Sequence, residues 1–202
     1  TRFKAEPQGK NPRDKADWLL RGLRMRAFEP LEEKGEEERA AGFVELENHD
    51  STEFALGNAL HGEWLLASYR IDQIRIPPAK LKEELERWAD AYEKDKGRPP
   101  GRFERAEARL AIRLELRAQT PPRSRTQDIA WNIENNQVQI WCVSRKLVEE
   151  IQLSMEKSFD VKLVPLVPQT LADGLGLEET ALKPTPELCW PGFGKESSDE
   201  QA

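Results

Sequence analysis

Arginines recur at four-residue spacing in the middle of an otherwise acidic chain. Residues 98–125 contain eight arginines and three glutamates, a net charge of +5, whereas the whole chain carries −6. A guanidinium group presents a planar fork of donors that matches phosphate oxygens, so a row of them is suited to following a nucleic-acid backbone. The eight residues are Arg98, Arg102, Arg105, Arg109, Arg113, Arg117, Arg123 and Arg125.

Two further cations begin a predicted helix. Ser144 is a good N-cap residue, and Arg145 and Lys146 follow it directly. The helix dipole disfavours cations in a first turn, which mildly favours a bound anion there. The alternative is that these side chains contact nearby carboxylates such as Glu149.

The arginines could equally be neutralised by the protein's own carboxylates. If two helices fold back on each other at Gly97–Gly101, the arginines of the second helix meet acids of the first. Such ion pairs flank apolar seams, and exposed pairs contribute little each. They would leave Arg98, Arg117, Arg123 and Arg125 free for DNA. The expected pairs are Glu93 with Arg102, Asp90 with Arg105, Glu86 with Arg109 and Glu83 with Arg113.

Signals for catalysis are weak. The chain has two histidines, His49 and His61, and no Cys-x-x-Cys motif, so a zinc site of ordinary spacing is not predicted. It also lacks a glycine-rich phosphate loop. A nuclease-type metal cluster could be drawn from Glu45, Glu47, Asp50 and Asp72, but 37 acidic residues make such coincidences common. We therefore expect no enzyme activity, no catalytic residue, no metal and no cofactor.

Composition narrows the class of protein. At 202 residues the chain is long enough to bury a hydrophobic core. Two cysteines give no disulfide framework, which favours a reducing compartment and a cytoplasmic location. No apolar run approaches the about 20 residues of a membrane span. The net charge of −6 argues against nucleic-acid binding by the whole surface but permits a local basic patch.

Hydrophobic periodicity indicates helices and strands in alternation. Pro77–Pro78 open a long helix that presents Leu81, Leu85, Trp88 and Tyr92 on one face, and a second helix from Arg102 to Ala118 turns Phe103, Leu110 and Leu114 inward. Asn11, Pro12 and Asp14 predict the start of an earlier helix that ends near Phe28. A last helix is expected from Ser144 to Ser158. Strands are expected at 1–6, 42–47, 64–76 and 161–167, the third with a bulge or a break near Asp72–Gln73.

The strongest hairpin signal surrounds Asn135–Asn136. Trp131 and Trp141 lie at alternating positions of this hairpin, which is typical of core residues, although exposed tryptophans there could stack on bases.

These elements predict an α+β fold, with an antiparallel or mixed sheet, packed helices and a protruding helical pair at about 77–120. Residues 1–76 and 120–190 would form the core, 77–119 a helical-pair appendage, and 191–202 a disordered tail.

Several segments, in their order, resemble the recombination-associated RdgC family of bacteria. The resemblance covers about Thr1 to Leu177 and is most specific in its last two stretches. The stretches are GFVELE (Gly42–Glu47), WLLASYRIDQIRIPPAKLKEELE (Trp64–Glu86), TPPRSRTQDIAWNIENNQVQIWCVSRKLVEEI (Thr120–Ile151) and FDVKLVPLVP (Phe159–Pro168).

The resemblance implies a non-enzymatic, nucleoid-associated protein that binds DNA with little sequence preference. It implies a curved homodimer that encloses duplex DNA and restrains a recombinase. The chain ends about 35 residues after the LVPL strand, so it is expected to be a short form without the usual C-terminal region, and its helical pair is rich in arginine rather than lysine. A second hypothesis stays open, namely a protein-interaction subunit whose arginines are internally salt-bridged and do not bind DNA.

Overall fold

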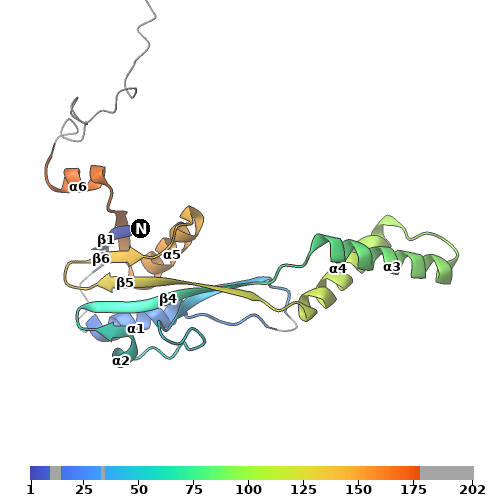
Figure 1. Cartoon of the computed structure of the whole chain (residues 1–202), viewed down its shortest axis with the longest axis horizontal. Coiled ribbons are helices and arrows are strands. Elements are labelled where there is room, and N and C mark those ends of the chain that lie inside the picture. Colours follow the sequence, from blue (N-terminus) through green and yellow to red (C-terminus); the bar gives the residue numbers. More distant parts are fainter. Residues whose placement is uncertain (10–14, 33–34, 178–202) are drawn as a thin grey trace, which may run out of the picture.

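The computed structural model describes residues 1–9, 15–32 and 35–177, which form an α+β fold around one antiparallel sheet (Figure 1). The strand order is β2-β4-β5-β6-β1-β7, and β3 pairs with β4. The predicted fold class is therefore confirmed. The strands are β1 (Arg2–Pro7), β2 (Arg39–Val44), β3 (Leu60–His61), β4 (Trp64–Gln73), β5 (Arg123–Asn132), β6 (Gln137–Ile140) and β7 (Val161–Pro165). The helices are α1 (Lys15–Met25), α2 (Leu56–Ala59), α3 (Pro78–Lys96), α4 (Arg102–Gln119), α5 (Arg145–Phe159) and α6 (Pro168–Gly174).

The hydrophobic core lies where α1 and α5 pack against each other and against one face of the sheet. Phe159 of α5 is at its centre, because its ring contacts Trp18 of α1, Phe43 of β2 and Trp131 of β5 at centroid distances of 5.2–6.3 Å. Burying one such aromatic side chain stabilises the fold by roughly 1.5–3 kcal/mol. Trp131 is therefore a core residue, as its alternation predicts.

Strands β4 and β5 form the longest ladder of the sheet. Every residue of β4 pairs with a residue of β5, from Trp64 opposite Asn132 to Gln73 opposite Arg123. Of the two alternatives predicted near Asp72–Gln73, the bulge is wrong and the break is correct, because β4 runs in regular register and ends at Gln73. Asp72 stays in regular register opposite Ser124, and both its carboxylate oxygens accept hydrogen bonds from Arg70 at 2.9 Å.

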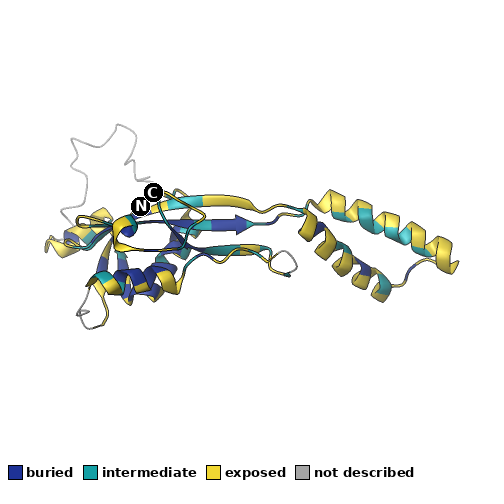
Figure 2. Ribbon diagram, turned by 90° about the horizontal axis from the view of Figure 1, so that it is seen from below, coloured by how far each residue is buried: buried dark blue, intermediate teal, exposed yellow. Residues whose placement is uncertain are grey.

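Helices α3 and α4 project from one end of the sheet and are called the arm here (Figures 1 and 2). Pro77 is the N-cap of α3, and Gly97 ends it with a φ of 65°, a left-handed conformation that glycine adopts without strain. The arm matches the predicted helical pair in position. The division of the chain into domains itself stays a prediction.

The predicted inward face of α4 is wrong. Phe103, Leu110 and Leu114 are 87%, 65% and 44% exposed, whereas Ala108 and Leu116 are buried. The helix carries two apolar stripes, and the one with the small residue Ala108 packs against α3. The other stripe faces solvent.

Other predicted boundaries differ in detail. Trp141 is 56% exposed, because β6 ends at Ile140 and alternation turns the next side chain away from the core. The short elements α2 and β3 have no counterpart among the predictions. The predicted helix start at Asn11, Pro12 and Asp14 and the predicted tail at 191–202 lie outside the described residues.

The contact between α1 and α5 makes Gly22 a sensitive position. A Cβ at Gly22 would lie 2.2 Å from Cε1 of Phe159. We expect Gly22→Ala to lower the free energy of unfolding by roughly 1–3 kcal/mol through overpacking, as measured by urea denaturation. The matched control is Gly57→Ala in α2, where a Cβ meets nothing within 4 Å and stability is expected to hold or rise slightly. Equal stability of the two variants would contradict this packing.

Candidate nucleic-acid interface

One face of β5 changes from apolar to basic along the strand. Alternate residues of a strand point to the same side, so Trp131, Ile129, Arg125 and Arg123 share a face. The first two are buried beneath the helices, and the two arginines are exposed beyond them. The face of β5 that contributes Trp131 and Ile129 to the core therefore presents arginines where the strand extends beyond the core.

The sheet register gathers further cations beside these two. Arg123 pairs with Gln73 of β4, and Gln73 pairs with Arg39 of β2, so the three residues form a row across three strands. Arg75 follows two residues after Gln73. Arg39 and Arg75 were not among the predicted site residues, because strand register is set by contacts between distant segments and no local pattern marks it.

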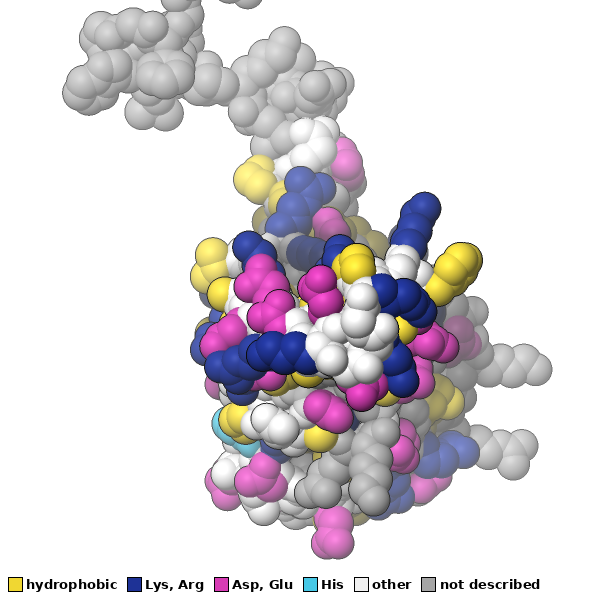
Figure 3. All heavy atoms as spheres, turned by 90° about the vertical axis from the view of Figure 1, so that its right-hand side faces the viewer, with side chains coloured by type: hydrophobic (Ala, Val, Ile, Leu, Met, Phe, Trp, Pro, Cys, Tyr) yellow, Lys and Arg dark blue, Asp and Glu magenta, His cyan; other side chains and the backbone are white. Residues whose placement is uncertain are grey.

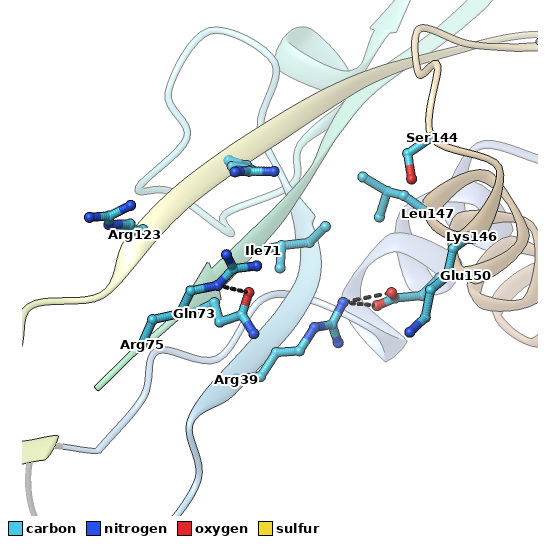
Figure 4. A pocket seen from close by; sticks show the side chains of 10 residues that line it. Arg39, Ile71, Gln73, Arg75, Arg123, Ser144, Lys146, Leu147 and Glu150 are labelled. Atoms are coloured by element: carbon cyan, nitrogen blue, oxygen red, sulfur yellow. Dashed lines mark hydrogen bonds and ion pairs between the residues drawn. The ribbon is translucent and has the colours of Figure 1, made fainter. Parts of the chain in front are cut away.

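These cations surround a cavity of about 530 Å³, called here the basic hollow (Figure 4). Glu150 of α5 is its one carboxylate, and both its oxygens accept hydrogen bonds from Arg39 at 2.6 Å. The buried Tyr69 hydroxyl also donates to Glu150, and burial raises the pKa of Tyr69. The charged residues of the basic hollow are Arg39, Arg75, Arg123, Arg125, Lys146 and Glu150.

A second cavity of about 580 Å³ extends the cationic surface to the arm. Arg75 and Arg123 line both cavities, and Arg109 and Arg113 of α4 line the second. Arg113 donates to both carboxylate oxygens of Glu38 at 2.7 and 2.8 Å, and this hydrogen bonding lowers the pKa of Glu38. Cations therefore follow one another from the start of α5 to the middle of α4.

The exposed row on α4 is not neutralised by α3. Within the described ranges, the side chains of Arg102, Arg105 and Arg109 form no ion pair or hydrogen bond. The predicted interhelical ion pairs are therefore wrong. Two of the four acids pair within α3 instead, Glu83 with Arg87 and Glu86 with Lys82. Viewed from the arm's end, basic, acidic and apolar side chains all reach the surface (Figure 3).

Two other predicted site residues are engaged within the protein. Arg117 is 3% exposed and donates to the backbone carbonyls of Glu32 and Glu37 at 2.7 and 2.9 Å. Arg98 binds Glu104 at 2.7 and 3.0 Å. The prediction that Arg98 and Arg117 are left free is therefore wrong, because both hold the arm in place, one at its tip and the other at its root.

The two cations that begin α5 differ from each other. Arg145 forms an i,i+4 ion pair with Glu149 at 3.1 Å, as the simpler interpretation of this helix start predicts. Lys146 lines the basic hollow, and its side chain forms no ion pair or hydrogen bond with any described residue.

The carboxylates considered for a nuclease cluster do not assemble. Burial opposes ionisation of Asp72, but hydrogen bonds from Arg70 and Ser124 hold its pKa below the usual value. Arg70 also binds Asp50, and Glu45 accepts a hydrogen bond from Ser51 at 2.6 Å. In the part of the chain that the structure describes, no three His, Cys, Asp or Glu side chains are placed to hold a metal ion.

Sequence comparison supplies one match to a known family. The family model described as "Putative exonuclease, RdgC" matches residues 7–173. Among curated proteins, none matches the chain. No helix within the described residues has the length and apolar character needed to cross a membrane.

Glu104 at the tip of the arm is expected to have a lowered pKa. This carboxylate accepts hydrogen bonds from Arg98, Tyr92 and the backbone amide of Gly101, and together these lower its pKa to about 2. We expect a carboxyl ¹³C NMR titration to show this midpoint, and Arg98→Gln to raise it toward 4.5. Arg102→Gln, which removes a neighbouring cation without such contacts, should leave it unchanged. An ordinary midpoint in the unaltered protein would contradict the tip geometry.

Proposed function

The chain belongs to the RdgC family, and from this premise we propose that it is a sequence-nonspecific DNA-binding protein that modulates recombination without catalysis. The observation that carries the proposal is the continuous run of cations from α5 through the basic hollow to α4. Arg102, Arg105 and Arg109 on the arm, with Arg123 and Arg125 on the sheet, are the proposed phosphate contacts.

Binding by charge explains both the expected affinity and the lack of sequence preference. Exposed guanidinium groups bind phosphate oxygens, which are the same in every sequence, and each contact releases condensed counterions. The cations span two helices and the end of a sheet, an extended surface suited to the backbone of duplex DNA. Coating of DNA by such a surface would compete with a recombinase, and it fits a cytoplasmic, nucleoid-associated protein.

The family description names an exonuclease, and we propose binding without cleavage on the basis of the carboxylates. Asp72 and Asp50 are both bound by Arg70, and Asp72 is 3% exposed. Metal-dependent nucleases need carboxylates that are grouped and accessible to a metal ion. Asp50 and Asp72 are instead bound by Arg70, and Glu45 is bound by Ser51.

A homodimer is the second part of the proposal. The exposed apolar stripe of Phe103, Leu110 and Leu114 on α4 is an unusual surface for a lone molecule in water. Two arms packed together would bury it, in keeping with the dimer that the family resemblance implies. The competing hypothesis of a non-binding interaction subunit requires the arginines to be bound within the protein. Arg98, Arg113 and Arg117 are so bound, whereas the exposed row on α4 has no such partner among the described residues.

A salt titration tests DNA binding. If about five phosphates are neutralised, the logarithm of affinity for a labelled duplex should fall with the logarithm of salt concentration at a slope of roughly −4 to −5 in fluorescence anisotropy. The double variant Arg123→Glu/Arg125→Glu should lose most of this binding. Arg21→Glu on α1, whose residue pairs with Asp17 away from the proposed surface, is the matched control and should bind normally. Salt-independent binding, or none at low salt, would refute the proposal.

Light scattering tests the dimer. We expect a dimer mass at micromolar concentration, and a monomer mass for Phe103→Ser/Leu110→Ser, because polar side chains remove the apolar contact. Leu153→Ser on α5 alters another exposed leucine and should leave the dimer intact. A monomeric unaltered protein would refute this part of the proposal.

A further inference from the structure

Arg113 continues the arginine row of α4, but a carboxylate of the protein itself occupies its donors. Residues four apart lie on the same face of neighbouring helical turns, so Arg113 follows Arg109 toward the root of the arm. Its Nε and Nη2 atoms donate to the two carboxylate oxygens of Glu38 at 2.7 and 2.8 Å. A guanidinium group binds a phosphate through the same two parallel hydrogen bonds. Glu38 therefore engages the donors that a phosphate following the row would use.

The pair lies in the wall of the second cavity, where cations surround Glu38. Arg75, Arg109, Arg113 and Arg123 line this cavity, and Glu38 is the one carboxylate among its described lining residues. Within the described ranges, the side chains of Arg109 and Arg123 form no ion pair or hydrogen bond. A DNA backbone bound at Arg109 brings negative charge beside Glu38, and like charges at close range repel each other. DNA that reaches Arg109 therefore favours release of Glu38 from Arg113.

The root of the arm can keep its place while this pair opens, because a second and buried contact also holds it. Arg117 is 3% exposed and donates to backbone carbonyls of segment 32–38. The side chains of Arg113 and Glu38 are 51% and 33% exposed, and exposed ion pairs contribute little to stability. The backbone carbonyl of Glu38 accepts a hydrogen bond from the amide of Ile74 at 2.8 Å, which keeps this residue at the sheet. Exchange of one side-chain partner at Arg113 thus leaves the surrounding backbone bonds intact.

We propose that Glu38 occupies a phosphate site at Arg113 in the free protein, and that a DNA phosphate takes its place on binding. The Glu38–Arg113 pair is then an autoinhibitory contact, because it competes with DNA for one member of the arginine row. This inference rests on the proposed DNA-binding function and adds an internal competitor that regulates it.

The size of the inhibition follows from the strength of the pair. A site that is open in only a fraction of the molecules binds its ligand with an apparent affinity reduced by that fraction. An exposed ion pair favours its closed state only a few-fold. Removing the carboxylate should therefore strengthen DNA binding by a similar factor.

The experiment compares Glu38→Gln with Glu36→Gln by anisotropy of one labelled duplex at a fixed salt concentration. Both variants remove one negative charge from the same segment, but no described residue binds the Glu36 side chain. We expect Glu38→Gln to bind roughly three- to fivefold more tightly than Glu36→Gln. In the Arg113→Gln background the two glutamate variants should bind equally, because the contested donors are gone. Cooperative urea unfolding with an unchanged slope checks that each variant is folded.

The outcomes separate this inference from the function on which it rests. Equal affinity of folded Glu38→Gln and Glu36→Gln, or weaker binding by Glu38→Gln, would overturn the internal competitor. Salt-steep binding by the unaltered protein would still support the proposed function in either case. Failure of the unaltered protein to bind the duplex at low salt would overturn both.

Discussion

The antiparallel ladder between β4 and β5 is the interaction on which the rest of the structure depends. At one end its side chains, among them Leu65 and Trp131, are buried in the core with α1 and α5. At the other end the same two strands run past the helices and carry Arg123 and Arg125 on the same face. Because every residue of the ladder is paired, it sets the position of the arm relative to the core. The cations of α4 and α5 form one surface only through this connection.

The arginines of the basic segment serve two different purposes. Arg98, Arg113 and Arg117 are bound to Glu104, to Glu38 and to backbone carbonyls, so they hold the arm at its tip and root. Those on the solvent side of α4 have no such partner among the described residues. An arginine committed to the fold can reach a phosphate only by breaking its existing bonds. The net charge of a segment therefore overstates how many of its arginines can bind DNA phosphates. The hydrogen-bond partners of each arginine predict this better.

Local sequence signals predicted where the helices and strands lie, whereas packing between distant segments determines which residues form the candidate site. Proline before α3, glycine after it and the Asn135–Asn136 turn act on their own backbone, so these boundaries were correct. The inward face of α4 could not be chosen from sequence, because two apolar stripes compete and only contact with α3 selects the one containing Ala108. Arg39 was missed because its place beside Gln73 depends on strand register. The exposed side chain of Trp141 has a local origin, since Val138 and Ile140 point into the core and alternation turns the next residue outward.

The arm is inserted between two strands that are direct neighbours. Gln73, the last residue of β4, pairs with Arg123, the first residue of β5, so the chain leaves and re-enters the sheet at one place. In the topology of the sheet, β4 and β5 form a β-hairpin whose loop is the whole arm. The entropy cost of closing a loop grows only with the logarithm of its length. Natural variation can therefore lengthen, shorten or recharge the arm while the core keeps its register, and relatives can differ in reach without differing in fold.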